Sequence, residues 1–153
     1  MLTPGRAFAC VALASLAACA SQQAHRSAGG ILSIDVPSES GNDLPTVRQA
    51  GSMVVGERFE IRLGASSGTG YQWMLAGPTP ANMQMTSADP AGAVKPQDGV
   101  PRPGGATWTT FGMTAIAQGD AAMRFELVRP WENEGRAAPA RVVEVAVTVK
   151  PRP

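Results

Sequence analysis

The chain has 153 residues, of which 44% are hydrophobic and 16% charged, and its 13 basic and 12 acidic residues give a net charge of +1. Nucleic-acid binding usually requires a clustered positive face, and no long run of like charges is present, so we expect no nucleic-acid partner. The length suits one domain with its own core and is too short for two.

The first 18 residues have the features of a secretory signal. One basic residue, Arg6, precedes an apolar, alanine-rich run from Ala7 to Ala18 that is too short to span a bilayer as a permanent helix. The run leads into Leu16-Ala17-Ala18-Cys19, which resembles the bacterial lipobox, in which the Cys is lipidated and becomes the first residue after cleavage. Ordinary cleavage at a small-x-small site, without a lipid, is the alternative.

A lipid on Cys19 would anchor the mature protein stably to a membrane. Residues 19–30 have almost nothing to bury and are predicted to form a flexible tether, followed by a single domain over residues 31–153. Ala20 is not the Asp that resembles an inner-membrane retention signal in some bacteria, so we expect an outer-membrane lipoprotein that faces the periplasm. Because Cys10 is removed with the signal and Cys19 would be lipidated, no disulfide pair remains.

The domain is predicted to consist of β-strands. Apolar and polar residues alternate with a period of two, which places one face of each segment in the core and the other in water. The segments with this pattern are Ile31–Ile34, Thr46–Met53, Arg58–Leu63, Tyr71–Leu75, Phe111–Ala115, Met123–Leu127 and Val143–Val149. Residues 89–105 are rich in proline and glycine and are predicted to form a long exposed loop. Short strands with Gly and Pro turns predict an all-β, Ig-like antiparallel β-sandwich of about six to eight strands.

The usual residues of catalysis are missing from this domain. His25, the single histidine, lies in the tether, so neither a Ser-His or Cys-His site nor a zinc cluster is expected. Glu132 and Glu134 would suit a hydrolase that uses two carboxylates, but loop charges in water lack the burial that raises a catalytic pKa. We therefore expect no enzymatic activity, no metal and no cofactor.

Three short segments between the predicted strands carry the candidate binding residues. They combine glycines, which permit unusual backbone angles, with Trp and Arg, which are enriched in binding hot spots. The segments are Ser66, Ser67, Gly68, Thr69, Gly70 and Tyr71; Arg102, Pro103, Gly104 and Gly105; and Arg129, Pro130, Trp131 and Glu132. Composition alone leaves plain turns as an alternative for the first two, and a core position as an alternative for Trp131. We expect Tyr71 and Trp73 in the core with Leu75, and Trp108 either in the core or at its rim.

In content and spacing these segments resemble the chagasin-type inhibitors of papain-like cysteine proteases. The pattern of that family is Asn-Pro-Thr-Thr-Gly-Tyr, then a Gly-rich loop, then Arg-Pro-Trp. The resemblance covers roughly Val47 to Val149 and is most specific in Thr69–Trp73 and Arg129–Glu132. The chain departs from the pattern at positions 66 to 68, where Ser-Ser-Gly stands in place of Asn-Pro-Thr.

The resemblance implies a reversible inhibitor of papain-like cysteine proteases, built as an Ig-like sandwich with three binding loops at one end. We expect the protein to be a monomer. In such inhibitors the first loop enters the active-site cleft, with the Thr that Thr69 matches near the catalytic Cys and His, and the other two loops lie along its sides. The alternative is a lipid-anchored Ig-like module of the cell envelope with a protein partner, or with a glycan bound through Trp108 and Trp131.

Overall fold

The domain is built from strands throughout the part that the structure describes. The structure is a computed structural model that describes residues 25–26, 31–38, 46–86, 93–96, 98–100, 103–132 and 138–153. Its strands are β1 (His25–Arg26), β2 (Ile31–Val36), β3 (Val47–Val54), β4 (Arg58–Ser66), β5 (Gln72–Leu75), β6 (Met83–Met85), β7 (Ala93–Pro96), β8 (Ala106–Ala115), β9 (Gly119–Val128) and β10 (Arg141–Lys150). Within these ranges no helix is long and apolar enough to cross a membrane. The predicted signal, Cys19, most of the tether, Arg102 and Glu134 lie outside the described residues.

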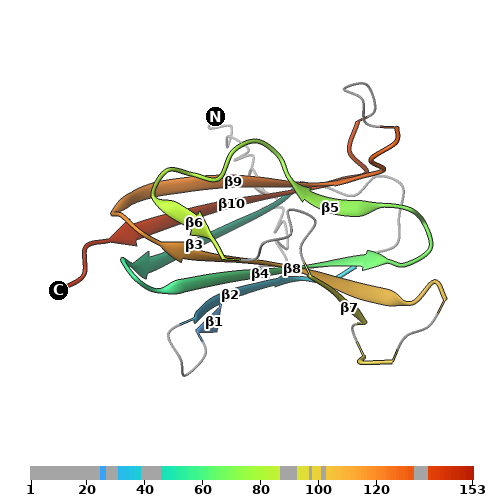
Figure 1. Cartoon of the computed structure of the whole chain (residues 1–153), viewed down its shortest axis with the longest axis horizontal. Coiled ribbons are helices and arrows are strands. Elements are labelled where there is room, and N and C mark those ends of the chain that lie inside the picture. The colour runs from blue at the N-terminus through green and yellow to red at the C-terminus, as the bar shows by residue number, and fades with distance from the viewer. Residues whose placement is uncertain are drawn as a thin grey trace, which may run out of the picture.

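The strands form two stacked sheets (Figure 1). One sheet has the order β1-β2-β4-β8, and both β6 and β7 pair with β8 along its far edge; the other has the order β3-β10-β9-β5. The predicted all-β, Ig-like sandwich is confirmed. The sheets are mixed, however, because β2 runs parallel to β4 and β3 runs parallel to β10. Parallel neighbours need a crossover, and the chain between β2 and β4 supplies it by visiting the other sheet as β3.

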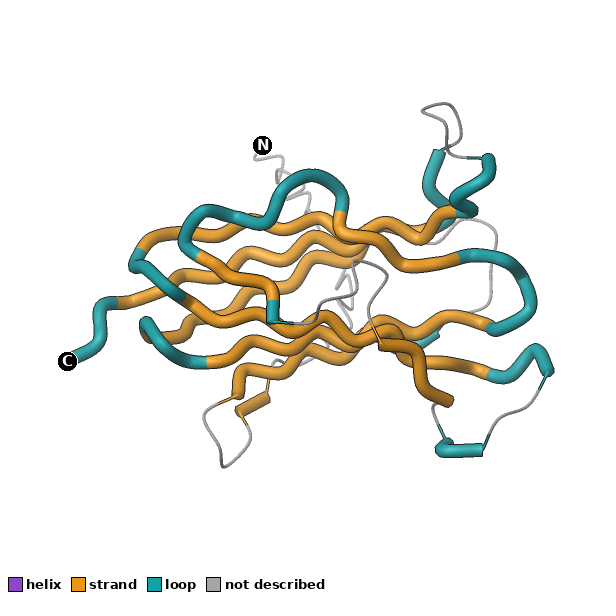
Figure 2. The backbone as a smooth tube through the Cα atoms, viewed as in Figure 1, coloured by secondary structure: helices purple, strands orange, loops and turns teal. Residues whose placement is uncertain are grey.

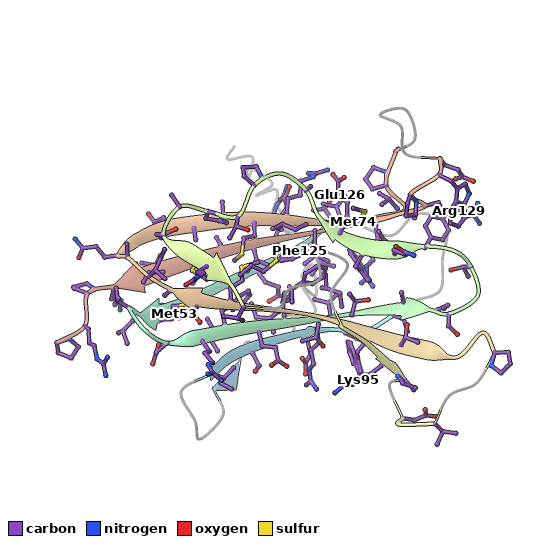
Figure 3. The ribbon with its side chains drawn as sticks, in the orientation of Figure 1. Met53, Met74, Lys95, Phe125, Glu126 and Arg129 are labelled. Atoms are coloured by element: carbon purple, nitrogen blue, oxygen red, sulfur yellow. The ribbon has the colours of Figure 1, made fainter. Side chains whose placement is uncertain are left out.

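The core lies between the two sheets and follows the period-two pattern. In β4, β8, β9 and β10 alternate side chains are buried, as the alternation of apolar and polar residues predicts. Phe111 of one sheet meets Phe125 of the other with ring centres 4.9 Å apart, and Figure 3 shows Phe125 pointing between the sheets. Each fully buried apolar side chain of this size contributes about 1.5 to 3 kcal/mol of transfer free energy. The predicted core position of Trp73 is confirmed, and Leu75 packs against the core.

Three strands, β1, β6 and β7, were not among the predicted segments. β1 lies within residues 19–30, which were predicted as a flexible tether, and it pairs with β2. β7 lies inside residues 89–105, which were predicted as an exposed loop, so that prediction is wrong for residues 93–96. The proline argument excluded only a central strand, and β7 pairs with β8 alone, at the edge of its sheet. β6 has three residues, too few for any periodicity to be visible.

The two ends of the sandwich carry different connections (Figures 1 and 2). At one end lie the β4–β5, β7–β8 and β9–β10 connections. At the other end lie the β3–β4 and β8–β9 turns, joined by a hydrogen bond from the Gly56 amide to the Ala115 carbonyl, 2.8 Å long. The chain leaves β10 at this second end, where the Val55 amide donates to the Lys150 carbonyl. The C-terminus at Pro153 is therefore far from the first group of connections (Figure 1).

Candidate functional site

Strand pairing brings the three predicted segments together. The first segment crosses from β4 in one sheet to β5 in the other. β4 pairs with β8, so that Ser66 lies opposite Ala106 at the end of the second segment. β5 pairs with β9, so that Gln72 lies opposite Val128 at the start of the third. The first segment is therefore flanked on both sides by the other two (Figure 2).

We name these connections by their described residues. Loop 1 is residues 67–71, loop 2 is residues 98–100 and 103–105, and loop 3 is residues 129–132. Loop 1 meets loop 2 through its backbone, because the Ser67 amide donates to the Gly105 carbonyl at 2.8 Å. Gly68 and Gly104 have φ angles of 82° and 69°, and a Cβ on Gly68 would be 3.8 Å from the Gly104 nitrogen. This backbone contact ties loop 1 to the first sheet.

Loop 1 meets loop 3 through the side chain of Arg129. Its Nε donates to the Thr69 carbonyl at 3.2 Å, and its guanidinium carbon lies 4.4 Å from the centre of the Tyr71 ring. The same guanidinium pairs with Glu132 at 3.0 Å. The predicted core position of Tyr71 is wrong: the residue precedes β5 and is half-buried, with its ring against Arg129. Figure 3 shows Arg129 at the loop end of the molecule.

Trp131 is held at the surface, and its core alternative is ruled out because 65% of the residue is exposed. The Glu132 amide donates to the Arg129 carbonyl at 3.0 Å and closes a turn that has Pro130 at its second position, where the fixed φ of proline fits. The edge of the indole rests on Gly70. A Cβ on Gly70 would lie against Cη2 and only 2.7 Å from Cζ2, so glycine is required there.

Loop 1 presents a small, uncharged tip. Gly68 and Thr69 are exposed, as is Ser66 at the end of β4, and the Thr69 hydroxyl donates to the Ser66 carbonyl at 2.9 Å, which closes the loop on its own start. Gly68 and Gly70 both have positive φ angles, 82° and 76°, which only glycine adopts at low cost. The tip therefore offers backbone groups and short, uncharged side chains.

Val100 joins the candidate site, whereas Trp108 lies outside it. Val100 in loop 2 was not predicted, yet it is exposed, and its amide donates to the Asp98 carboxylate at 3.0 Å. The Asp98-Gly99 dipeptide is a turn signal that marks this position. Trp108 lies outside the loops, on the outward face of β8, with the guanidinium carbon of Arg62 5.6 Å from its ring centre.

Outside the loops, a pair of charged side chains links two neighbouring strands. The hydrogen bond to Asp35, aided by the charge of that carboxylate, raises the pKa of Arg62, and this pair links neighbouring strands β4 and β2. Within the described ranges, no group of three or more His, Cys, Asp or Glu side chains is placed to hold a metal ion.

Comparison with known proteins places this geometry in a family. The family model described as Chagasin family peptidase inhibitor I42 matches residues 52–149, more than half of the chain. No curated protein matches the chain. Among solved structures, the cysteine protease inhibitor EhICP2 from Entamoeba histolytica has a TM-score of 0.53 and 17% identity, over 69% of this chain and 94% of that one.

A second similar structure is PbICP-C, which was solved in complex with falcipain-2. Its TM-score is also 0.53, with 20% identity over 77% of this chain and 98% of that one. At these identities both structures support the shared fold. The match of the family model decides the family: the protein belongs to the chagasin family of peptidase inhibitors, which block a peptidase and catalyse no reaction of their own.

Proposed function

We propose that this protein is a reversible inhibitor of papain-like cysteine proteases and that loops 1, 2 and 3 together fill the active-site cleft. The observation that carries the proposal is the set of contacts that joins loop 1 to loop 2 and to loop 3. The family supports an inhibitor, and the complex of PbICP-C with falcipain-2 supports a cysteine protease as the partner.

Inhibition of this kind requires loops that are already ordered, and it requires no reaction between inhibitor and protease. Loops that are already ordered lose less conformational entropy when they bind, so they bind more tightly than flexible loops with the same contacts. The Asn-Pro of the family pattern is absent here, but the Ser67 amide is held by Gly105 and the Thr69 carbonyl by Arg129. Loop 1 is thus restrained from both sides, and its small tip would keep substrate away from the catalytic nucleophile.

Trp131 is the side chain that we expect to supply most of the binding free energy on the loop 3 side. An exposed indole with one edge fixed against the backbone of Gly70 can bury its remaining surface on a partner and lose little side-chain entropy. Truncation of Trp residues in such positions often costs about 2 kcal/mol or more.

The proposal is tested by titrating papain and a cathepsin-like relative with the purified chain beginning at residue 20, while hydrolysis of a fluorogenic peptide is followed. We expect tight, reversible inhibition. Thr69→Arg and Trp131→Ala should each weaken it about 30-fold or more, since one clashes in the cleft and the other removes a hot spot. Both changes affect exposed residues, so the midpoint of urea unfolding should move little.

Arg48→Ala is the control, because Arg48 lies on β3, two strands away from β9 and loop 3, and its guanidinium pairs with Glu144 of the neighbouring strand β10. It should inhibit like the unmodified protein. If Thr69→Arg and Trp131→Ala both inhibit as strongly as the unmodified protein, the proposed role of the loops is contradicted. A folded protein that inhibits neither protease at micromolar concentration would favour the envelope-module alternative.

A further inference from the structure

We propose that Arg129 is a positioning residue, which orders loop 1 before any partner is bound and acts on binding through that loop. This inference deepens the proposed function and rests on it for its effect on inhibition. Its effect on the free protein can be measured without any protease. Sequence composition suggests a different role, since an Arg beside a Trp is typical of a direct hot-spot contact.

The guanidinium of Arg129 is used within the molecule. Its central carbon lies over the Tyr71 ring, its Nε donates to the Thr69 carbonyl, and a terminal nitrogen donates to Glu132. These three contacts suit the planar shape of the group, which can stack through its face while it donates from its rim. A lysine ammonium has no such plane, so it cannot make the stack and the in-plane donations together.

Loop 1 needs a restraint at the point where Arg129 binds. Thr69 stands between Gly68 and Gly70, and glycine loses more conformational freedom on ordering than any other residue. The bond from the Thr69 hydroxyl to Ser66 closes the loop on itself but does not fix it to a neighbour. The hydrogen bond from Arg129 to the Thr69 carbonyl fixes the tip to loop 3.

The same residue also sets the position of Trp131. The carbonyl of Arg129 accepts the hydrogen bond that closes the turn around Trp131, and its side chain pairs with Glu132 across that turn. The indole in turn rests on Gly70, next to the carbonyl group that Arg129 holds. Arg129 thus connects the tip of loop 1 and the exposed indole, the two features that the proposed function uses.

The decisive experiment compares the free protein with Arg129→Lys and Tyr71→Leu by NMR relaxation. In the unmodified protein we expect backbone order parameters of about 0.85 at Thr69 and Gly70, and in both variants values below about 0.6. Arg124→Lys is the matched control, since Arg124 also lies in ion pairs, with Glu126 and Glu144, but on the outward face of the second sheet. It should leave the order of loop 1 unchanged.

The kinetics of papain inhibition separate positioning from direct contact. If Arg129 only positions loop 1, Arg129→Lys lowers the fraction of molecules whose loop 1 is in the binding conformation. The association rate constant should then fall about tenfold or more, while the dissociation rate constant changes little. Loss of a direct contact would instead accelerate dissociation. Unchanged order parameters in Arg129→Lys would overturn the inference, as would lost order with unchanged inhibition. If the unmodified protein inhibits no protease, the proposed function fails, and the order parameters still decide whether Arg129 orders the loop.

Discussion

At the scale of single residues, position 70 requires glycine for two separate reasons. Its φ of 76° belongs to the left-handed region, and the Trp131 indole occupies the space that a Cβ would fill. Gly77 has a similar φ of 87° but open space around it. The two positions therefore separate the effect of backbone conformation on stability from the effect of a displaced indole on inhibition.

We predict that Gly70→Ala and Gly77→Ala each lower the free energy of unfolding by about 1 to 2 kcal/mol, the cost of the left-handed conformation for a residue with a Cβ. Only Gly70→Ala should also move Trp131 and weaken inhibition. Urea unfolding measures the first effect and protease titration the second. If Gly77→Ala weakens inhibition as much as Gly70→Ala does, the contact of the Trp131 indole with Gly70 does not matter for inhibition.

Residue patterns identified the members of the site but not their contacts. The glycines of loop 1 and the Arg-Pro-Trp of loop 3 stood out because turn residues and hot-spot residues have distinctive chemistry. The placement of the indole on Gly70 joins residues about sixty positions apart and depends on the pairing of β5 with β9. Tyr71 was misplaced for a related reason: its alternation with Trp73 suggested the core, but β5 begins one residue later.

At the scale of elements, Trp73 joins the two sheets beneath loop 1. It lies on β5, is fully buried, and donates from its indole nitrogen to the Gly64 carbonyl of β4 at 3.0 Å. Gly64 is the first residue of β4 beyond its pairing with β2, which ends at Leu63. The indole therefore holds both strands together where loop 1 leaves one sheet and enters the other.

We predict that Trp73→Phe lowers the free energy of unfolding by about 2 kcal/mol, because it removes a buried hydrogen bond and leaves a carbonyl without that donor. Trp108→Phe is the matched control on the outward face, where the ring is half-buried and Phe keeps a face for Arg62, so the cost should be below about 1 kcal/mol. Denaturant unfolding measures both. Equal costs would mean that the bridge to Gly64 adds nothing.

Elements with a long, regular alternation could be predicted, whereas their partners could not. The patterns in β4, β9 and β10 reveal which face is buried, and burial follows from that face alone. The parallel pairing of β2 with β4 and of β3 with β10 leaves no mark on periodicity, because side chains alternate in the same way in both pairings. β1, β6 and β7 are short and are defined by their pairing, β1 with β2 and the other two with β8, and all three were missed.

At the scale of the whole molecule, the sequence before the domain predicts a lipid anchor. We expect the full chain to incorporate radiolabelled palmitate in a bacterial host and to sediment with the membranes, because Cys19 ends a lipobox-like segment. Cys19→Ser should abolish both properties, and Cys10→Ser, a change within the segment that is removed, should affect neither. Labelling that survives in Cys19→Ser would contradict the anchor.

The polarity of the sandwich has a practical consequence for the use of this protein. Loops 1 to 3 and the C-terminus at Pro153 lie at opposite ends of the long axis (Figure 1). A biotin tag or a fused protein placed after Pro153 would therefore couple the domain to a sensor chip or a resin with every molecule in one orientation. Such a surface would present all its loops outward, as an affinity matrix for whichever proteases they recognise.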